Sequence, residues 1–259
     1  QIANCCGSRQ LGRISKVVPF LPHKRCVYHY SIPSSLWARY EQTSLKPPIA
    51  LTIDDAPGRH DSVNNALLDL FKDHNVRATF FIISGHVKDH EEVCRRMVRE
   101  GHELGNHSTE DRAVADLSEG EFEARLTECE NILDSLRETA GGQREEGNDG
   151  LNRKKWFRPP CAALSWKMCS VLEKKGFTNV LADVYALDEA LGRSEDFIID
   201  FVKKKTQPGS IVVLHSPSDS FRQHLKKVLW EVVPFLAERF RCVTLSELAA
   251  EAEGRLPGG

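Results

Sequence analysis

Apolar and polar residues follow two alternating patterns along most of the chain. Short apolar runs predict buried strands, whereas apolar residues spaced three and four positions apart predict amphipathic helices. The predicted strands are 49–53, 78–83, 103–106, 180–183, 211–214 and 242–245, and the predicted helices are 62–74, 90–100, 118–136, 165–175, 195–205 and 223–239. Strands that alternate with helices predict a parallel sheet with outer helices, and the number of repeats favours an α/β fold of the (β/α) barrel type.

Local signals set the limits of several elements. Ser118 followed by Glu121 is a capping box and predicts a helix start. Pro234 predicts a break or kink inside the last long helix. The glycine-rich and charged residues 137–155 predict an exposed loop rather than a domain linker. We therefore expect an irregular N-terminal extension that wraps the core (1–46), a single catalytic domain (47–250) and a frayed C-terminal tail (251–259).

Composition excludes some classes of protein. The 259 residues are 41% hydrophobic and 28% charged, as in a globular chain with a sizeable core. The formal net charge is −2, which argues against a nucleic-acid partner because phosphate binding needs a basic surface. No apolar run approaches the roughly 18 residues that a membrane helix needs, so no membrane span is expected. A neutral polymer such as a glycan remains compatible with this balance.

The eight cysteines show no Cys-x-x-Cys pair, which argues against a structural zinc ribbon. Cys94 and Cys129 lie in apolar helical stripes and are interpreted as buried thiols. Cys5, Cys6 and Cys26 lie in the irregular leader, where a disulfide is more plausible. The chain begins with Gln1 rather than Met, which suggests a processed or trimmed form.

Residues with chemical potential follow the predicted strands. Catalytic groups of barrel enzymes lie at the C-terminal ends of strands, so the side chains found there are candidates. They are Asp54 and Asp55 after strand 49–53, His107 and Asp111 after 103–106, Arg158 ahead of the helix at 165, Asp188 after 180–183, and His215 after 211–214.

These residue types suit hydrolysis assisted by one divalent metal. Asp55, His107 and Asp111 offer three ligands and leave coordination open for water or substrate. Asp54 then serves as a base toward water, and His215 as an acid toward the leaving group. Arg158 could pair with a carboxylate. Each residue alone has a structural interpretation as a turn, a cap or a hydrogen-bonded core group, but their common position at strand ends favours a site.

Four motifs together resemble the polysaccharide deacetylases, which are carbohydrate esterase family four with the NodB-homology fold. The resemblance covers about residues 47–250, and the segment 101–108 is its most specific part. The motifs are Thr52-Ile53-Asp54-Asp55, Gly101-His102-Glu103-Leu104-Gly105-Asn106-His107-Ser108, Arg158-Pro159-Pro160 and Ile211-Val212-Val213-Leu214-His215, and Ala78-Thr79-Phe80-Phe81 is also typical of the family.

The resemblance implies a distorted (β/α)7-type barrel that removes acetyl groups from polysaccharides. It implies that Asp54 is the catalytic base and that His215 is the catalytic acid, tuned by Asp188. Asp55 and His107 match metal ligands, and Arg158 matches the arginine that steadies the carboxylates of the site. The family's oxyanion is held by the metal and by a backbone N–H that here belongs to Cys161.

The chain departs from the family pattern at four places. Asp111 stands where the family has a third ligand histidine, which keeps zinc as the expected metal but makes manganese or cobalt more competitive. Ile53 and Ala56 replace Phe and Gly in the first motif. Cys161 replaces an aromatic residue of the groove. Glu189 replaces a tryptophan that shapes the acetyl pocket, and Tyr185 or Trp166 could substitute for it.

The sequence therefore predicts a metal-dependent deacetylase of N-acetylglucosamine units, with chitin or chitooligosaccharide as the first substrate. A deacetylase of another glycan, peptidoglycan or acetylxylan, is an alternative. We expect a monomer in the secretory pathway or outside the cell. One alternative is an inactive glycan-binding pseudoenzyme. Others are a hydrolase of small amides or imides, favoured by a closed pocket rather than an open cleft, and a non-enzymatic interaction module.

Overall fold

The computed structural model describes residues 26–141, 154–189, 194–218 and 222–255. The chain divides into two compact units. Unit 1 contains Phe81–Arg99 and Leu104–Leu181 together with the chain up to Val27, and unit 2 contains Tyr28–Phe80, Glu100–Glu103 and Ala182–Gly259. The predicted division at residues 46 and 250 stays a prediction.

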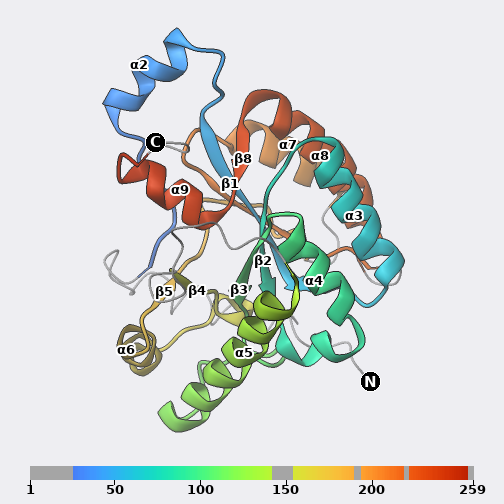
Figure 1. Ribbon diagram of the computed structural model, residues 1–259, viewed down its shortest axis with the longest axis vertical. Helices are drawn as coiled ribbons and strands as arrows, with labels where there is room; N and C mark the ends of the chain where they lie inside the picture. Colours follow the sequence, from blue (N-terminus) through green and yellow to red (C-terminus); the bar gives the residue numbers. More distant parts are fainter. Residues whose placement is uncertain (1–25, 142–153, 190–193, 219–221, 256–259) are drawn as a thin grey trace. The chain divides into compact units, whose positions relative to one another are not determined.

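Unit 2 is built on parallel strands around β1 (Pro48–Ala56), as Figure 1 shows. On one side β1 pairs with β7 (Ile211–His215), which pairs in turn with β6 (Val184–Tyr185), and on the other side β1 pairs with β8 (Arg241–Val243). The helices of this unit are α2 (Ser34–Gln42), α3 (Asp61–Asp73), α7 (Glu195–Lys205), α8 (His224–Arg239) and α9 (Leu245–Ala252).

Strand β2 (Thr79–Ile82) leads the chain from unit 2 into unit 1. There β3 (Glu103–Asn106), β4 (Lys155–Phe157) and β5 (Phe177–Asn179) pair in parallel in that order. The helical elements are η3 (Ser84–Asp89), α4 (Glu91–Arg99), α5 (Glu119–Thr139), η4 (Pro160–Ala162) and α6 (Trp166–Lys174). Parallel pairing between strands that helices separate confirms the predicted α/β class.

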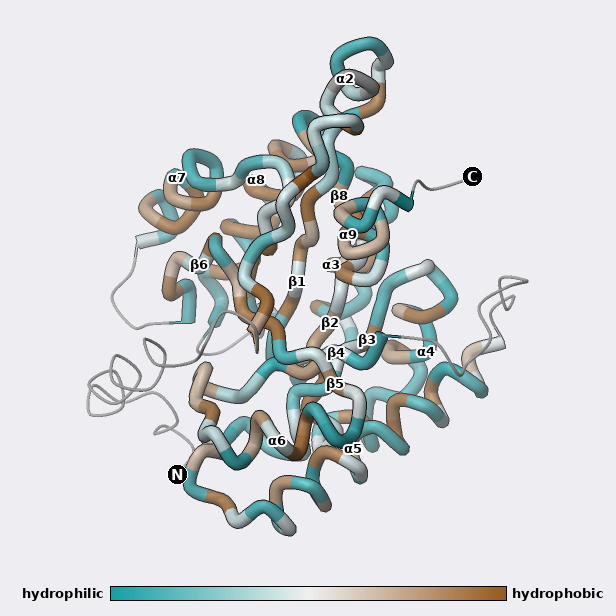
Figure 2. Tube along the Cα trace, turned by 90° about the vertical axis from the view of Figure 1, so that its left-hand side faces the viewer, coloured by the Kyte–Doolittle hydropathy of each residue, from teal (hydrophilic) through white to brown (hydrophobic). Residues whose placement is uncertain are grey.

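Burial explains why these segments adopt their elements. All nine residues of β1 are buried, and Thr52, in its middle, donates its hydroxyl to the Val212 carbonyl at 2.8 Å. Along α5 hydrophobic and hydrophilic positions alternate as the helix turns (Figure 2), and its apolar stripe is buried. The predicted capping box of Ser118 and Glu121 begins this helix. Cys129 in the stripe donates its thiol to the Ile82 carbonyl, and burial raises its pKa to about 12.

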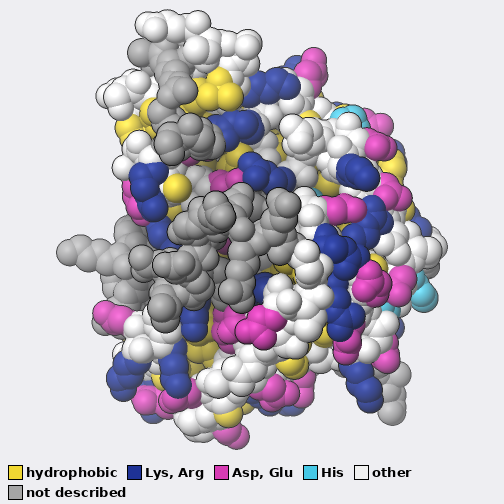
Figure 3. All heavy atoms as spheres, in the orientation of Figure 1, with side chains coloured by type: hydrophobic (Ala, Val, Ile, Leu, Met, Phe, Trp, Pro, Cys, Tyr) yellow, Lys and Arg dark blue, Asp and Glu magenta, His cyan; other side chains and the backbone are white. Residues whose placement is uncertain are grey.

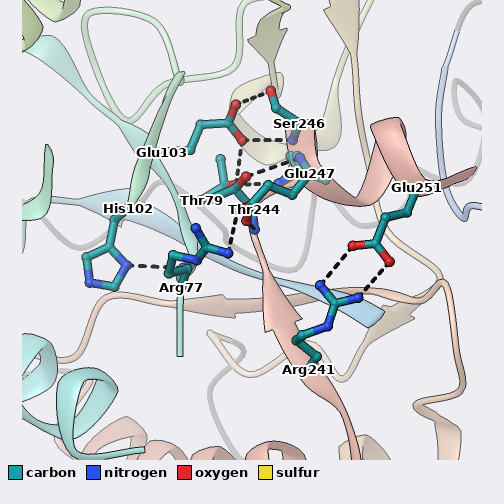
Figure 4. Close-up of polar contacts among 11 residues, drawn as sticks. Arg77, Thr79, His102, Glu103, Arg241, Thr244, Ser246, Glu247 and Glu251 are labelled. Carbon is teal, nitrogen blue, oxygen red and sulfur yellow. Dashed lines mark hydrogen bonds and ion pairs between the residues drawn. The ribbon is translucent and has the colours of Figure 1, made fainter. Parts of the chain in front are cut away.

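A polar network fixes α9 within unit 2 (Figure 4). The Thr79 hydroxyl donates to Glu103 at 2.8 Å and accepts from the Leu245 N–H at 2.9 Å. Glu103 also accepts from the backbone N–H and the hydroxyl of Ser246. The N-terminal N–H groups of α9 thus find acceptors, which any helix start requires.

Some predicted elements differ from the structure. The predicted strand 180–183 is wrong, because the chain pairs before it in β5 and after it in β6. Strand β1 continues through Ala56, so Asp54 and Asp55 lie within it rather than after it. Helix α8 continues through Pro234.

Other elements escaped prediction because they are short. Strand β4 has three residues, α9 has eight, and α2 lies inside the segment expected to be irregular. Residues 1–25 and 142–153, with the leader cysteines Cys5 and Cys6 and most of the predicted loop, lie outside the described residues.

Charged side chains of both signs are interspersed on the face shown in Figure 3, outside the grey atoms, in keeping with the small net charge. Among the helices that the structure describes, none is both long and apolar enough to cross a membrane.

Candidate active site

Two predicted catalytic residues lie on neighbouring strands of unit 2. Asp54 on β1 is paired with His215 on β7 in the parallel register. Paired residues of adjacent strands project to the same face of a sheet, with the strands about 4.8 Å apart. Asp54 and His215 are therefore neighbours at the C-terminal ends of their strands, and both are buried. A base and an acid so close together can serve opposite ends of one scissile bond.

Asp188 holds His215 by two hydrogen bonds. Its carboxylate accepts the backbone N–H of His215 at 2.8 Å and the ring Nδ1–H at 2.9 Å. Burial lowers the pKa of His215, but the charge of Asp188 and the hydrogen bond to it outweigh burial and raise the pKa to about 10. The ring is therefore an imidazolium at neutral pH, and Nε2 is the nitrogen that can give a proton to a leaving group.

Asp55 is engaged by an arginine that the sequence did not single out. Its carboxylate Oδ2 lies 2.6 Å from Nη1 of Arg222, and the two side chains are each only 10% exposed. Asp55 also has a φ of 57°, in the left-handed region that non-glycine residues seldom adopt. Such backbone positions persist where the surroundings hold them and are frequent at functional sites. Arg222 lies in the segment just before α8, where no periodic pattern marked it.

Tyr185 and Glu189 lie beside the catalytic histidine. The rings of Tyr185 and His215 have centroids 6.3 Å apart, and the Tyr185 hydroxyl donates to Glu189. Glu189 Oε2 lies 3.9 Å from Nδ1 of His215. Of the two aromatic residues expected to substitute at the acetyl pocket, Tyr185 is the one that lies near His215. Trp166, the other, is on α6 in unit 1 and is 51% exposed.

Among the described residues, Asp188, Glu189 and His215 form a group of potential metal ligands whose ligand atoms lie within 4.8 Å of one another. Nδ1 of His215 donates its hydrogen to Asp188, so this nitrogen has no lone pair to offer a metal in this arrangement. We therefore interpret the group as a charge-assisted acid pair with an adjacent glutamate, and not as the metal centre.

In unit 1, His107 is oriented for a ligand role. It follows β3, is buried, and its Nδ1 lies 2.7 Å from the Arg158 carbonyl. A carbonyl only accepts, so Nδ1 carries the hydrogen, and in the neutral ring the lone pair is then on Nε2. Histidine ligands of metals are usually held by such a hydrogen bond from the other ring nitrogen. Asp111 lies half-buried in the irregular segment between β3 and α5.

Arg158 is a buried residue that anchors this part of unit 1. Its guanidinium donates to the carbonyls of Val180 and Leu181 at 3.2 and 3.0 Å. It also lies over the Phe81 ring, with Cζ 4.1 Å from the centroid. These contacts fix the guanidinium at the end of β4 and, through its carbonyl, fix the ring of His107.

Cys161 has a φ of 55°, and Ala162 after it has a φ of 51°. Two consecutive non-glycine residues in the left-handed region turn the chain sharply after the double proline. This turn directs the backbone N–H groups of the segment independently of side-chain type, so an N–H donor role for Cys161 does not depend on its thiol.

The donor chemistry fits a divalent metal. His107 offers an imidazole nitrogen whose ring is held through Nδ1, and Asp55 offers a buried carboxylate. Nitrogen and carboxylate oxygen donors suit zinc, manganese and cobalt. Asp54, Asp188 and His215 thus lie together in unit 2, and Asp55 and His107 are donors of the types that these metals take.

Comparison with known proteins assigns the family. The polysaccharide deacetylase family model matches residues 41–180, and the chain belongs to this family. A peptidoglycan-N-acetylglucosamine deacetylase of Bacillus cereus is 28% identical over 81% of this chain and 71% of its own length. A chitooligosaccharide deacetylase of Azorhizobium caulinodans is 26% identical over 82% of this chain and 92% of its own length.

Solved structures confirm the predicted family fold. The crystal structure of a peptidoglycan N-acetylglucosamine deacetylase has a TM-score of 0.68 and 25% identity, and the match covers 85% of this chain and 91% of that one. A family 4 acetyl xylan esterase of Clostridium thermocellum, solved with a cobalt ion, has a TM-score of 0.65 at 25% identity over 81% of this chain and 93% of its own. A pseudoenzyme of the same family from Bacillus anthracis shares the fold, with a TM-score of 0.62 at 23% identity over 80% of this chain and 66% of its own.

Proposed function

We propose that the protein is a metal-dependent hydrolase that removes N-acetyl groups from N-acetylglucosamine units of a glycan. The observation that carries the proposal is the pairing of Asp54 and His215 on adjacent strands of unit 2, with Asp188 bound to His215, in a chain of the deacetylase family. The names of two relatives point to chitooligosaccharide and peptidoglycan, which both contain this sugar. Chitooligosaccharide is our first choice of substrate and peptidoglycan is the second. Acetylxylan is a further alternative, in which O-acetyl groups would be removed instead.

We assign Asp55, His107 and Asp111 as the ligands of one divalent ion, with zinc first and manganese or cobalt as competitors because of Asp111. When bound, such an ion supplies Lewis-acid stabilisation of charge on a carbonyl oxygen and lowers the pKa of water. Arg158 holds the ring of His107 through its carbonyl, so that Nε2 is the ligating atom.

The protein residues then carry the protons. Asp54 takes a proton from water as the water oxygen bonds to the acetyl carbon. The Cys161 N–H donates to the developing oxyanion, a type of interaction worth several kcal/mol, about 3 for one donor. His215, charged and held by Asp188, gives its Nε2 proton to the amide nitrogen as the C–N bond breaks. Acetate and a glucosamine unit are the products.

The pocket for the acetyl group is the part of this proposal where the sequence departs from the family motif, at Glu189. We assign Tyr185 to the wall beside His215, in the role that the family gives to a tryptophan. Its hydroxyl is held by Glu189, which fixes the ring orientation. We further propose action as a monomer in the secretory pathway or outside the cell, where glycan polymers are accessible.

The test is acetate release from chitin oligomers and from peptidoglycan by metal-stripped protein, with zinc, manganese and cobalt restored one at a time. Wild-type protein should regain release with metal, and Asp54→Asn should lose it by about a hundredfold or more while binding the metal as before. Asp73→Asn, at the exposed end of α3 in the same unit, is the matched control and should retain release. Loss of bound metal in Asp54→Asn would make Asp54 a ligand instead of a base.

The ion pair between Asp55 and Arg222 favours a second candidate, a glycan-binding pseudoenzyme. In that case the Arg222 guanidinium permanently occupies the Asp55 carboxylate that a metal would otherwise bind. Binding of chitin oligomers without acetate release in any metal would support this candidate, and release from any acetylated glycan would exclude it.

A further inference from the structure

The ion pair between Asp55 and Arg222 joins the end of β1 to the start of α8 within unit 2. Nη1 of Arg222 lies 2.6 Å from Oδ2 of Asp55, and both side chains are nearly buried. Two residues on, His224 donates from Nε2 to the Asp188 carbonyl at 2.8 Å. The segment 222–224 therefore contacts two residues of the candidate active site, Asp55 through an ion pair and Asp188 through a hydrogen bond to its backbone carbonyl.

The Asp55 carboxylate has two potential cationic partners. One is a metal ion: zinc binds a carboxylate oxygen at about 2.0–2.2 Å. A guanidinium at hydrogen-bonding distance from Oδ2 neutralises the same charge that the ion would use. Two cations beside one buried carboxylate repel each other strongly, because the local dielectric is low. Binding of the ion at Asp55 and retention of this ion pair therefore oppose each other.

We propose that Arg222 is an internal counter-cation of the metal site, which holds Asp55 in the metal-free protein and lowers the affinity for the divalent ion that must displace it. The inference rests on the proposed function, since it takes Asp55 as a metal ligand. The contact of His224 with Asp188 keeps the segment attached when the guanidinium moves, so the displacement needs only the Arg222 side chain to change position.

A purely structural ion pair is the competing interpretation, and the chain contains a matched example of one. Arg241 on β8 binds both oxygens of Glu251 on α9, at 2.9 and 2.7 Å (Figure 4). Arg241 pairs in register with Pro48, at the opposite end of β1 from Asp55. This pair also lies in unit 2 and is largely buried, but it contains no proposed metal ligand.

The experiment is calorimetric titration of zinc into metal-stripped wild-type protein, Arg222→Gln and the control Arg241→Gln. We expect Arg222→Gln to bind zinc about tenfold more tightly or better, equivalent to about 1.4 kcal/mol or more. Arg241→Gln should bind as the wild type does. Equal or weaker binding by Arg222→Gln overturns the inference, because Arg222 would then be neutral or would support the ligand.

Thermal unfolding gives a second readout. Metal-free Arg222→Gln should melt below the wild type, because it leaves a buried carboxylate without its cation. Saturating zinc should abolish that difference, whereas the deficit of Arg241→Gln should persist with zinc. A deficit of Arg222→Gln that persists in zinc would identify a structural pair and overturn the inference.

Arg222→Lys keeps a cation and serves if Arg222→Gln fails to fold. Lysine keeps the positive charge but has a shorter reach toward Asp55. The zinc affinity of Arg222→Lys should therefore equal that of the wild type or lie between those of the wild type and Arg222→Gln. Affinity below that of the wild type would contradict displacement.

Failure of the inference is distinguishable from failure of the proposed function. Equal zinc affinities combined with metal-dependent acetate release would reject the counter-cation role and keep the deacetylase. Absence of zinc binding by both proteins would reject both.

Discussion

Gly105→Ala is the substitution that tests most directly how unit 1 positions the proposed metal ligand. A Cβ at Gly105 would lie 2.7, 2.8 and 3.2 Å from three atoms of the Phe81 ring. Phe81 is fully buried, and Arg158 lies over its ring with Cζ 4.1 Å from the centroid. The His107 ring is 6.2 Å away, centroid to centroid. The ring therefore cannot yield to a methyl group without moving Arg158, His107 or the backbone.

Two effects follow from this crowding. Overpacking of a well-packed core costs about 1–3 kcal/mol, and each kcal/mol lowers the melting temperature by about 2–4 °C in a domain near this size. Displacement of the ligand geometry by up to about 1 Å can reduce turnover by about a hundredfold. We therefore expect a melting temperature several degrees lower, weaker zinc binding and a lower rate of acetate release.

Gly120→Ala is the matched control. Gly120 lies in α5 of the same unit, and a Cβ there meets no atom within 4 Å. Alanine is favoured over glycine in a helix by up to about 1 kcal/mol, so this variant should be equally or more stable and equally active. The measurements are differential scanning calorimetry, zinc titration and acetate release. Unchanged stability and unchanged zinc affinity in Gly105→Ala would refute the contact chain from Phe81 to His107.

Two further predictions concern the acid and the third ligand. Folding raises the pKa of His215 to about 10, above the value of about 6.5 for an unfolded histidine, so the stabilisation is complete below about pH 6.5 and is lost as the pH rises toward about 10. Urea unfolding should therefore show a decline of wild-type stability over this range that is flatter in Asp188→Asn, and parallel profiles would contradict the pairing. Asp111→His should keep metal and shift the preference toward zinc, whereas Asp111→Ala should lose affinity; unchanged metal content in Asp111→Ala would remove Asp111 from the ligand set.

Hydrophobic periodicity predicted the longer elements because each buries one continuous stripe or run. Residues 118–136 correspond to α5 with its capping box, and residues 103–106 correspond to β3. Strand β4 follows a charged stretch and has too few residues for any period to show. Pro234 did not end α8, because buried apolar residues on both sides of it hold the helix to the core of unit 2. Tertiary burial there outweighs the local preference of proline.

Some residues of the candidate site could likewise be predicted from the sequence and others could not. Asp54, Asp188 and His215 could be named from the sequence because strand ends and family motifs mark them, and their contacts lie within unit 2. Arg222 could not, since an arginine seven positions beyond a strand carries no pattern of its own. Its partner Asp55 precedes it by more than 160 residues, and only the folded chain brings the two together. Tyr185 became the preferred aromatic only through its position beside His215.

Two residues of the proposed site, Asp111 and Arg222, bear on the same balance of charge. Exchanging a neutral ligand histidine for Asp111 makes the proposed ligand set more negative by one, so a divalent ion bound by two aspartates and one histidine is neutralised rather than left with a surplus positive charge. Arg222 adds one positive charge beside Asp55. In the metal-free protein the arginine thus offsets part of the negative charge of the two proposed carboxylate ligands. An ion that displaces it would meet both carboxylates and would be bound more favourably than beside one aspartate and two histidines. An arginine that merely replaced the metal would need no second ligand carboxylate. The presence of both residues therefore favours a site that exchanges its internal cation for a metal over one that has lost its metal.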